Sequence, residues 1–125
     1  MTEVTVGLAG GVAHVRRHFR ESDARLMIYT ARRFYGEDLY RMNVASACTT
    51  PEALLETARG IARDIAKASP SAVRAAKRSF QTTENLSIYE GYRFEQGQTK
   101  ELSTSKDTSE AMLAFKEKRA PNFDS

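Results

Sequence analysis

The carboxylate with the best setting for chemistry in this sequence is Glu3, which stands beside Val4 and Val6 and just before the glycine-rich stretch 7–11. A carboxyl group that is partly desolvated beside a substrate can act as a general acid or base. A loop that leads into a helix can hold the group in that position. The structural alternative is a frayed terminal glutamate, and the residues alone favour that alternative.

Two histidines are the candidates for a metal site. His14 and His18 lie four positions apart, so they can share one face of a helix. Helical zinc motifs with this spacing carry a glutamate directly after the first histidine, and this chain has Val15 there. No nearby cysteine or carboxylate completes a set of ligands, so we expect packed or solvated histidines and no metal.

The remaining candidates for a nucleophile are a thiol and three serines. Cys48 is the one cysteine, so no internal disulfide can form. It lies within 43–49, a stretch that alternates apolar and small polar residues and is predicted to form a short buried strand or an extended connector. A thiol buried there is inert. Ser22, Ser69 and Ser105 are predicted to be helix N-caps rather than nucleophiles.

The C-terminal segment 114–123, AFKEKRAPNF, combines aromatic and cationic side chains. Aromatic rings can stack on a nucleotide base, and cations can pair with phosphates. The candidates are the rings of Phe115 and Phe123 and the cations of Lys116, Lys118 and Arg119. Cations near the C-terminus of a helix also interact favourably with its dipole, which is the structural alternative. The residues alone do not decide between these two interpretations.

Helical periodicity dominates the segments that must position these residues. The clearest apolar stripe follows Thr50-Pro51-Glu52, where a capping threonine and a first-turn proline predict the start of a helix. Its members are Leu54, Leu55, Ala58, Ile61, Ala62 and Ile65. Further helices are predicted over 12–19, 23–31 and 36–42, from Ser69-Pro70 onward, over 86–103 and from Asp107 onward. We therefore expect a mainly α fold with one short strand, at 43–49.

The last two predicted helices differ in their apolar faces. The helix over 86–103 has so few apolar residues that we expect another chain or domain to cover it. The stretch Asp107–Glu110 resembles a capping box that opens the final helix. Met112, Leu113 and Phe115 are expected to face inward from that helix.

Composition and charge narrow the class of protein. In these 125 residues there is neither an apolar run of about 18 residues nor a basic leader, so no membrane span and no secretory signal are expected. A lone cysteine fits a reducing compartment, and we expect a cytoplasmic protein. The net charge is +3 and the pI about 9.2, with basic residues spread along the chain. Nucleic-acid binding is therefore not expected, whereas a small anionic ligand can be attracted.

Taken in order, these segments resemble the second half of the crotonase superfamily, the enoyl-CoA hydratase/isomerase proteins. Residues 3–17 are similar to the family's glutamate, glycine-rich turn and basic helix. The most specific match is 114–123, which fits Ala-Phe-x-Glu-Lys-Arg-x-Pro-x-Phe at every named position. The other matches are Thr30–Phe34, Met42–Ala45, Ile65–Ala66, Ser69–Pro70 and Ala72–Lys77.

The resemblance implies a fold and roles for single residues. The fold is the C-terminal helical part of the crotonase α/β spiral, in which residues 1–50 end the spiral core and 51–125 form a helical oligomerisation region. Glu3 corresponds to the second of two catalytic glutamates. Phe115 and Lys118 correspond to residues near the adenine and phosphates of a coenzyme A. No separate cofactor is implied, because coenzyme A is part of the acyl-CoA substrate.

The resemblance also implies dependence on a second half. In the family a β/α spiral of roughly equal length supplies the acyl-CoA pocket, the oxyanion-hole N–H groups and the first glutamate. We therefore expect this chain to be inactive alone and to need an N-terminal half, present in some cases as a separate chain. Completed, it would hydrate or dehydrate acyl-CoA thioesters in fatty acid metabolism, through an enolate-like intermediate and within homotrimers or hexamers.

Two choices stay open at this point. Hydratases, isomerases, dehydratases and thioester hydrolases share the scaffold, and departures from the family pattern at Thr2, Ala31 and Asn43 leave the reaction undecided, although Glu3 favours hydration or dehydration. The alternative to a catalytic part is a non-catalytic helical module that assembles with itself. A catalytic part leaves apolar residues uncovered when its partner is absent, whereas a module buries them by self-association. The residues concerned are Val4, Val6, Met27, Ile28 and the short strand.

Overall fold

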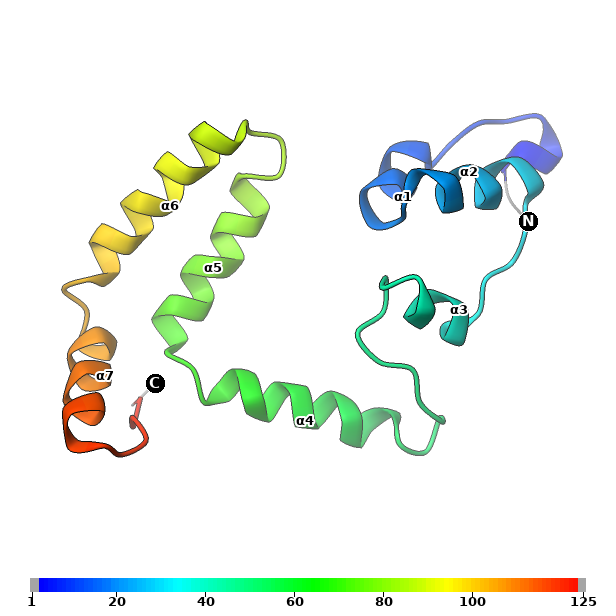
Figure 1. Ribbon diagram of the computed structural model, residues 1–125. Coiled ribbons are helices and arrows are strands. Elements are labelled where there is room, and N and C mark those ends of the chain that lie inside the picture. Colours follow the sequence, from blue (N-terminus) through cyan, green and yellow to red (C-terminus); the bar gives the residue numbers. More distant parts are fainter. Residues whose placement is uncertain (1–2, 124–125) are drawn as a thin grey trace. The chain divides into compact units, whose positions relative to one another are not determined.

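The computed structural model of the protein describes residues 3–123 and consists of helices joined by loops (Figure 1). The elements are η1 (Glu3–Val6, a 3-10 helix), α1 (Val12–His18), α2 (Glu21–Thr30), α3 (Gly36–Arg41), α4 (Leu54–Ala66), α5 (Pro70–Thr82), α6 (Ile88–Leu102) and α7 (Lys106–Glu117). The chain divides into two compact units, Met1–Thr57 and Ala58–Ser125, here called the first unit and the second unit. No helix within residues 3–123 has the length and apolarity that a membrane crossing requires.

The first unit is organised around the pair α1 and α2, which pack against each other. Gly11 precedes α1 with φ 73°, in the left-handed region that glycine adopts without strain. The helix α2 begins at Glu21, directly after the extended residue Arg20 (ψ 149°). The prediction that Ser22 caps this helix is therefore wrong, because Ser22 lies inside its first turn. Glu21 and Asp23 place negative charge in that turn, where the helix dipole favours it.

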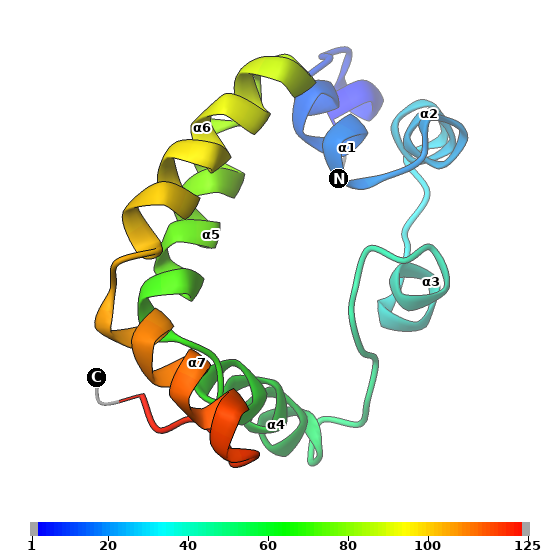
Figure 2. The same cartoon turned by 60° about the vertical axis from the view of Figure 1, so that its left-hand side comes forward.

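The second unit contains a hairpin in which α5 and α6 run side by side in opposite directions (Figures 1 and 2). Ser69 caps α5 as predicted, since its Oγ accepts a hydrogen bond from the N–H of Ala72 (3.1 Å). A capping box of Ser87 and Glu90 opens α6. Gly91 is buried, and a Cβ there would lie 3.4 Å from the Cβ of Thr83. A glycine at this position therefore lets the second helix start close to the end of the first.

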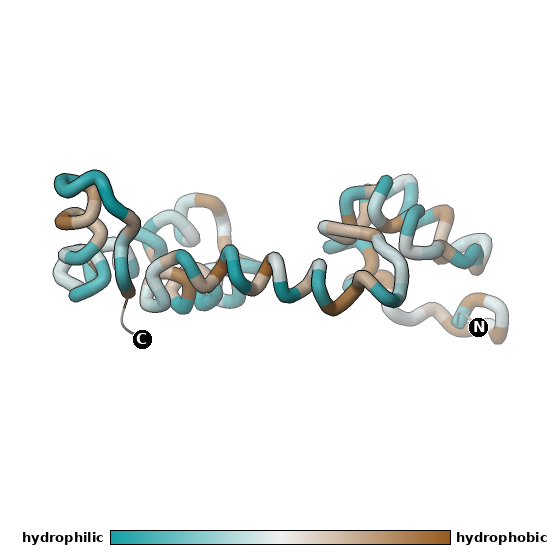
Figure 3. Tube along the Cα trace, turned by 90° about the horizontal axis from the view of Figure 1, so that it is seen from below, coloured by the Kyte–Doolittle hydropathy of each residue, from teal (hydrophilic) through white to brown (hydrophobic). Residues whose placement is uncertain are grey.

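Both units bury small side chains and expose large apolar ones. Within residues 3–123 the buried apolar residues are Ala24, Ala75 and Ala114, whereas Phe80 is 82% and Ile88 is 94% exposed. Apolar positions recur along the helices of both units (Figure 3). The chain exposes 10410 Å², while two separate compact units of these sizes would expose roughly 8,000 Å². The helices therefore carry apolar surface that this chain does not cover.

The strand expected at 43–49 is absent from the part of the chain that the structure describes, where this segment forms a turn, bends and an irregular connection. A strand needs a neighbour to accept and donate its backbone hydrogen bonds, and residues 3–123 contain no second strand. The expectation of a buried thiol is also wrong, because Cys48 is exposed.

The final helix differs from its prediction in two respects. It starts one residue before the expected box, and Ser105 is its N-cap, as predicted for that serine, since its Oγ accepts from Thr108 N–H (3.1 Å). Asp107 is therefore not the cap. Met112 and Leu113, expected to face inward, are 59% and 47% exposed. The inward position of this helix is Ala114, because a small side chain lets the helix approach its neighbours closely.

Asp107 instead links the first turn of α7 to the first turn of α5. Its Oδ2 accepts hydrogen bonds from Ser69 Oγ (2.6 Å), Ser71 Oγ (2.6 Å) and Ser71 N–H (3.1 Å). The hydrogen bonds from Ser69 and then Ser71 lower the pKa of the carboxyl group. One carboxylate oxygen thus ties the N-termini of two helices that are 36 residues apart in the chain.

Removing this carboxylate should weaken the second unit. We expect Asp107→Ala to lower the melting temperature by about 5 °C, because Ser71 N–H and two hydroxyls lose their acceptor. Thermal melts followed by circular dichroism measure the change. Asp64→Ala is the matched control, since the Asp64–Lys67 pair is an exposed surface pair. Equal melting temperatures of Asp107→Ala and the control would show that the link contributes nothing.

Candidate functional site

Glu3 lies in a hydrogen-bonded turn rather than in a free end of the chain. Its carbonyl oxygen accepts from Leu8 N–H (2.9 Å), and Gly7 N–H donates to Val4 O (3.3 Å). The side chain extends over Gly10, where a Cβ would lie 3.5 Å from Glu3 Oε1. The glycine-rich turn therefore places the carboxylate beside the loop that leads into α1. The carboxylate is solvent-exposed in this chain, so a desolvating surface has to come from elsewhere.

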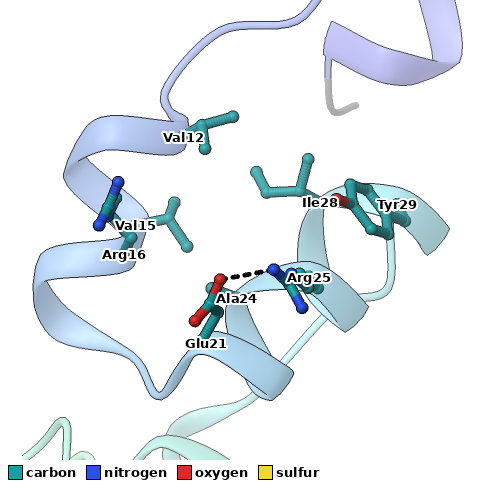
Figure 4. Close-up of a pocket in the computed structure, with 8 residues that line it drawn as sticks. All are labelled: Val12, Val15, Arg16, Glu21, Ala24, Arg25, Ile28 and Tyr29. Carbon is teal, nitrogen blue, oxygen red and sulfur yellow. Dashed lines mark hydrogen bonds and ion pairs between the residues drawn. The ribbon is translucent and has the colours of Figure 1, made fainter.

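An apolar hollow of about 310 Å³ lies between α1 and α2 in the first unit (Figure 4). Val12, Val15 and Ile28 point toward one another across it. On its rim, Arg25 Nη2 donates to Glu21 Oε1 at 2.6 Å. The hollow can accept an apolar side chain, and an apolar surface with a polar rim is typical of a contact site for another protein segment.

The histidines predicted to be solvated or packed lie on α1, and both His14 and His18 are exposed. Within residues 3–123, no three side chains of His, Cys, Asp or Glu are grouped so that they could hold a metal ion. The thiol of Cys48 lies near Gly36, where a Cβ would be 3.2 Å from its sulfur. Neither the histidines nor the thiol joins Glu3 in a site.

The two residues predicted to contact a nucleotide meet in one turn at the end of α7. Phe115 is 85% exposed and lines an open hollow with Leu102, Ala111 and Met112. Lys118 follows the last helical residue, and its N–H donates to the Phe115 carbonyl (3.3 Å). The exposed ring of Phe115 and the ammonium group of Lys118 therefore belong to residues three positions apart, and hydrogen bonds fix the turn that carries them.

This turn is a Schellman motif with an unusual residue at its left-handed position. Arg119 N–H donates to Ala114 O (3.0 Å), and Lys118 N–H to Phe115 O. Lys118 has φ 55° and ψ 38°, a conformation that costs an L-residue roughly 1–2 kcal/mol. Glycine is the usual residue there. The hydrogen bonds of the turn therefore hold Lys118 in a left-handed backbone conformation that lysine disfavours.

A network of charged groups surrounds the turn. Arg119 Nη1 donates to Glu110 Oε1 at 2.6 Å, and Arg119 Nε donates to Glu117 Oε2 at 2.6 Å. Asn122 N–H also donates to Glu110 Oε1 (2.7 Å). The guanidinium of Arg119, followed by the Asn122 N–H, lowers the pKa of Glu110 to about 2, and the two carboxylates raise the pKa of Arg119. The network fastens the residues after α7 back onto that helix.

The rest of the C-terminal motif also has a structural role. Phe123 is half-buried and lines a hollow with Ile65 and Val73 of the second unit. The sequence places Glu110 in a capping box and does not predict its pairing with the tail. Its partner Arg119 is nine positions away, which is no helical or strand spacing, so no local pattern could have revealed the pair.

The structure thus brings Phe115 and Lys118 together in the second unit, and Glu3 belongs to the first unit. Glu3 stands on a glycine-rich turn before a helix, as a general acid or base would. The turn at Lys118 offers an aromatic ring and a cation, which suit a base and a phosphate.

The sequence is similar to that of known proteins over nearly its whole length. A family model described as Enoyl-CoA hydratase/isomerase matches residues 2–125. The carnitinyl-CoA dehydratase of Salmonella arizonae is 34% identical over 119 residues, which are 92% of this chain and 46% of that protein. A probable enoyl-CoA hydratase of Rhizobium meliloti is 32% identical over 124 residues, which are 97% of this chain and 48% of that protein.

The fold is similar to solved structures to the same extent. An enoyl-CoA hydratase from Bacillus anthracis matches with a TM-score of 0.88 and 30% sequence identity, covering 98% of this chain and 48% of that one. An enoyl-CoA hydratase/isomerase from Mycobacterium paratuberculosis matches with a TM-score of 0.87 and 26% identity, over 98% and 47% of the two chains. The chain spans about half the length of the relatives that it matches.

The charged network predicts a pH dependence of stability. The pKa of Glu110 falls from 4.5 to about 2 in the folded protein, so the carboxylate stabilises the fold above pH 4.5 and this contribution is lost as the pH falls toward 2. We expect Glu110→Gln to melt about 5 °C below the wild type at pH 7 and the two to converge near pH 2. Melts at several pH values test this. A gap that persists unchanged to pH 2 would contradict it, and Asp64→Asn serves as the surface control.

Proposed function

The chain belongs to the enoyl-CoA hydratase/isomerase family, and on that premise we propose that it is the C-terminal part of a protein that hydrates or dehydrates acyl-CoA thioesters. The relatives that support this proposal are named a carnitinyl-CoA dehydratase and a probable enoyl-CoA hydratase. In this proposal residues 1–50 end the spiral core and 51–125 form a helical oligomerisation region. The single cysteine fits a cytoplasmic location.

The observation that carries the proposal is the setting of Glu3. Its carboxylate rests over Gly10 on a turn fixed by backbone hydrogen bonds. In hydration, the oxygen of water bonds to the β-carbon of an unsaturated thioester and a proton is added to the α-carbon. Glu3 is one of a pair of carboxylates that orient the water and move these protons. Backbone N–H groups from the half that this chain does not match stabilise the enolate-like oxygen.

The uncovered apolar surface supports the need for that other half. Val6 and Val12, which flank the glycine-rich turn, are 53% and 47% exposed. A carboxylate in such a setting faces water, and a closed site around it needs a covering surface that these residues do not supply. The chain alone is therefore inactive in this proposal, and covering the first unit completes the site around Glu3.

At the other end of the chain, Phe115 and Lys118 hold the nucleotide portion of the acyl-CoA. The Phe115 ring stacks on the adenine, and the Lys118 ammonium pairs with phosphates. No separate cofactor is required. Further copies of the chain, as a trimer or hexamer, cover the exposed apolar residues of α6, such as Ile88 and Tyr92.

The exposed apolar faces also favour a second candidate, a non-catalytic helical module that assembles with itself. Leu54 and Ile65 of α4 are 58% and 52% exposed, and self-association would bury them without any catalytic half. The two candidates differ in the polypeptides that the particle contains, because only the catalytic one includes the other half of the fold.

The catalytic role of Glu3 is tested by exchange of its carboxylate for an amide. The chain is co-expressed with the half of the Rhizobium meliloti relative that it does not match, and hydration of crotonyl-CoA is followed by the loss of ultraviolet absorbance of the conjugated double bond. We expect Glu3→Gln to lower kcat by about 10²–10⁴-fold, because a general acid or base is removed. Glu37→Gln is the matched control on an exposed residue of α3. A Glu3→Gln particle with the control's rate would refute the role.

Native and denaturing mass spectrometry of the purified protein distinguishes the two candidates. The catalytic proposal predicts particles that contain polypeptide beyond the 14.0 kDa of this sequence, in a separate or a longer chain. The assembly module predicts particles whose mass is an integer multiple of 14.0 kDa and which have no crotonyl-CoA hydratase activity.

A further inference from the structure

The turn after α7 contains a residue whose conformation its own type does not favour. Lys118 occupies the left-handed position of a Schellman motif, with φ 55°. Glycine would satisfy the same two backbone hydrogen bonds without strain. A strained residue that the surroundings hold in place is a sign that its side chain is needed there.

Arg119 and Glu117, the residues on either side of Lys118, are joined to each other. Arg119 Nε donates to Glu117 Oε2 (2.6 Å), so an ion pair bridges the strained residue. The same guanidinium donates to Glu110 through Nη1 (2.6 Å) and Nη2 (3.2 Å). Glu110 in turn accepts from Asn122 N–H (2.7 Å), so the chain is fixed on both sides of Lys118.

The two cations of this turn, Lys118 and Arg119, differ in whether carboxylates are bound to them. Arg119 faces two carboxylates, which neutralise it and occupy its donors, so it is a poor phosphate ligand. Lys118 forms no ion pair among residues 3–123, and its side chain is exposed. The cation that remains available to an anion is therefore the strained one.

We propose that Arg119, together with Glu110 and Glu117, is a positioning residue that holds Lys118 in the left-handed conformation and so directs its ammonium group to the phosphates of the coenzyme A nucleotide. The inference rests on the proposed function, because it takes Lys118 as the phosphate ligand. It adds that the affinity for phosphate depends on a residue that does not touch the phosphate.

The test compares a matched pair of probes, adenosine 3′,5′-bisphosphate and adenosine, by isothermal titration calorimetry. The pair shares the base and sugar and differs in the phosphates, so the ratio of the two affinities reports the phosphate contact alone. We expect the wild type to prefer the bisphosphate by about tenfold, as for one charge-assisted hydrogen bond. Arg119→Lys keeps the charge but cannot form the same planar fork, and we expect the ratio to fall to about 2 or below.

Two further variants separate positioning from general loss of structure or charge. Lys118→Gly relieves the strained conformation, so we expect it to melt a few degrees higher than the wild type while it loses the preference for the bisphosphate. Lys100→Met removes one positive charge from an exposed position of α6 in the same unit and should keep the wild-type ratio. A variant that only destabilised the fold would weaken the binding of both probes equally.

The outcomes distinguish this inference from the function on which it rests. If the wild type binds both probes equally, the role of Lys118 in phosphate binding is refuted and the inference with it. If the wild type prefers the bisphosphate and Arg119→Lys retains the full ratio, only the positioning role of Arg119 is overturned. A Lys118→Gly variant that melts lower than the wild type would show that the turn stores no strain, which also overturns it.

Discussion

The burial of apolar side chains is the constraint on which the rest of this structure depends. The described helices bury alanines, such as Ala75 and Ala114, and expose residues such as Phe80 and Ile88. The surface in excess of two compact units is roughly 2,000 Å², more than the roughly 800 Å² that one partner contributes to a standard interface. An excess of this size is typical of polypeptides that fold together rather than of partners that meet transiently.

Polar links fix much of the local geometry of the second unit. Asp107 joins the starts of α5 and α7, and Arg119 fastens the tail to α7. Links between exposed groups contribute little to stability, so their main effect is to select an arrangement. In the first unit, backbone hydrogen bonds of the turn likewise fix the position of Glu3, whose side chain is exposed in this chain.

Interactions between residues a few positions apart could be predicted from the sequence, whereas contacts between residues farther apart could not. The caps at Ser69 and Ser105 were predictable because a cap involves a side chain and a backbone N–H three residues away. The strand at 43–49 was predicted wrongly because a strand depends on a partner elsewhere in the chain. The Glu110–Arg119 pair was missed for the same reason, whereas the family could be recognised from the order of several short motifs, each weak by itself.

The pairing of neighbouring helices has a kinetic consequence. Because α1 packs on α2 and α5 on α6, each hairpin joins elements adjacent in the chain, and such local structure forms within microseconds. In the proposed function another polypeptide covers the apolar faces that stay exposed, and the rate of that later step depends on distance along the chain or on concentration. In the interval between these two steps the exposed apolar surface makes the chain most prone to aggregate.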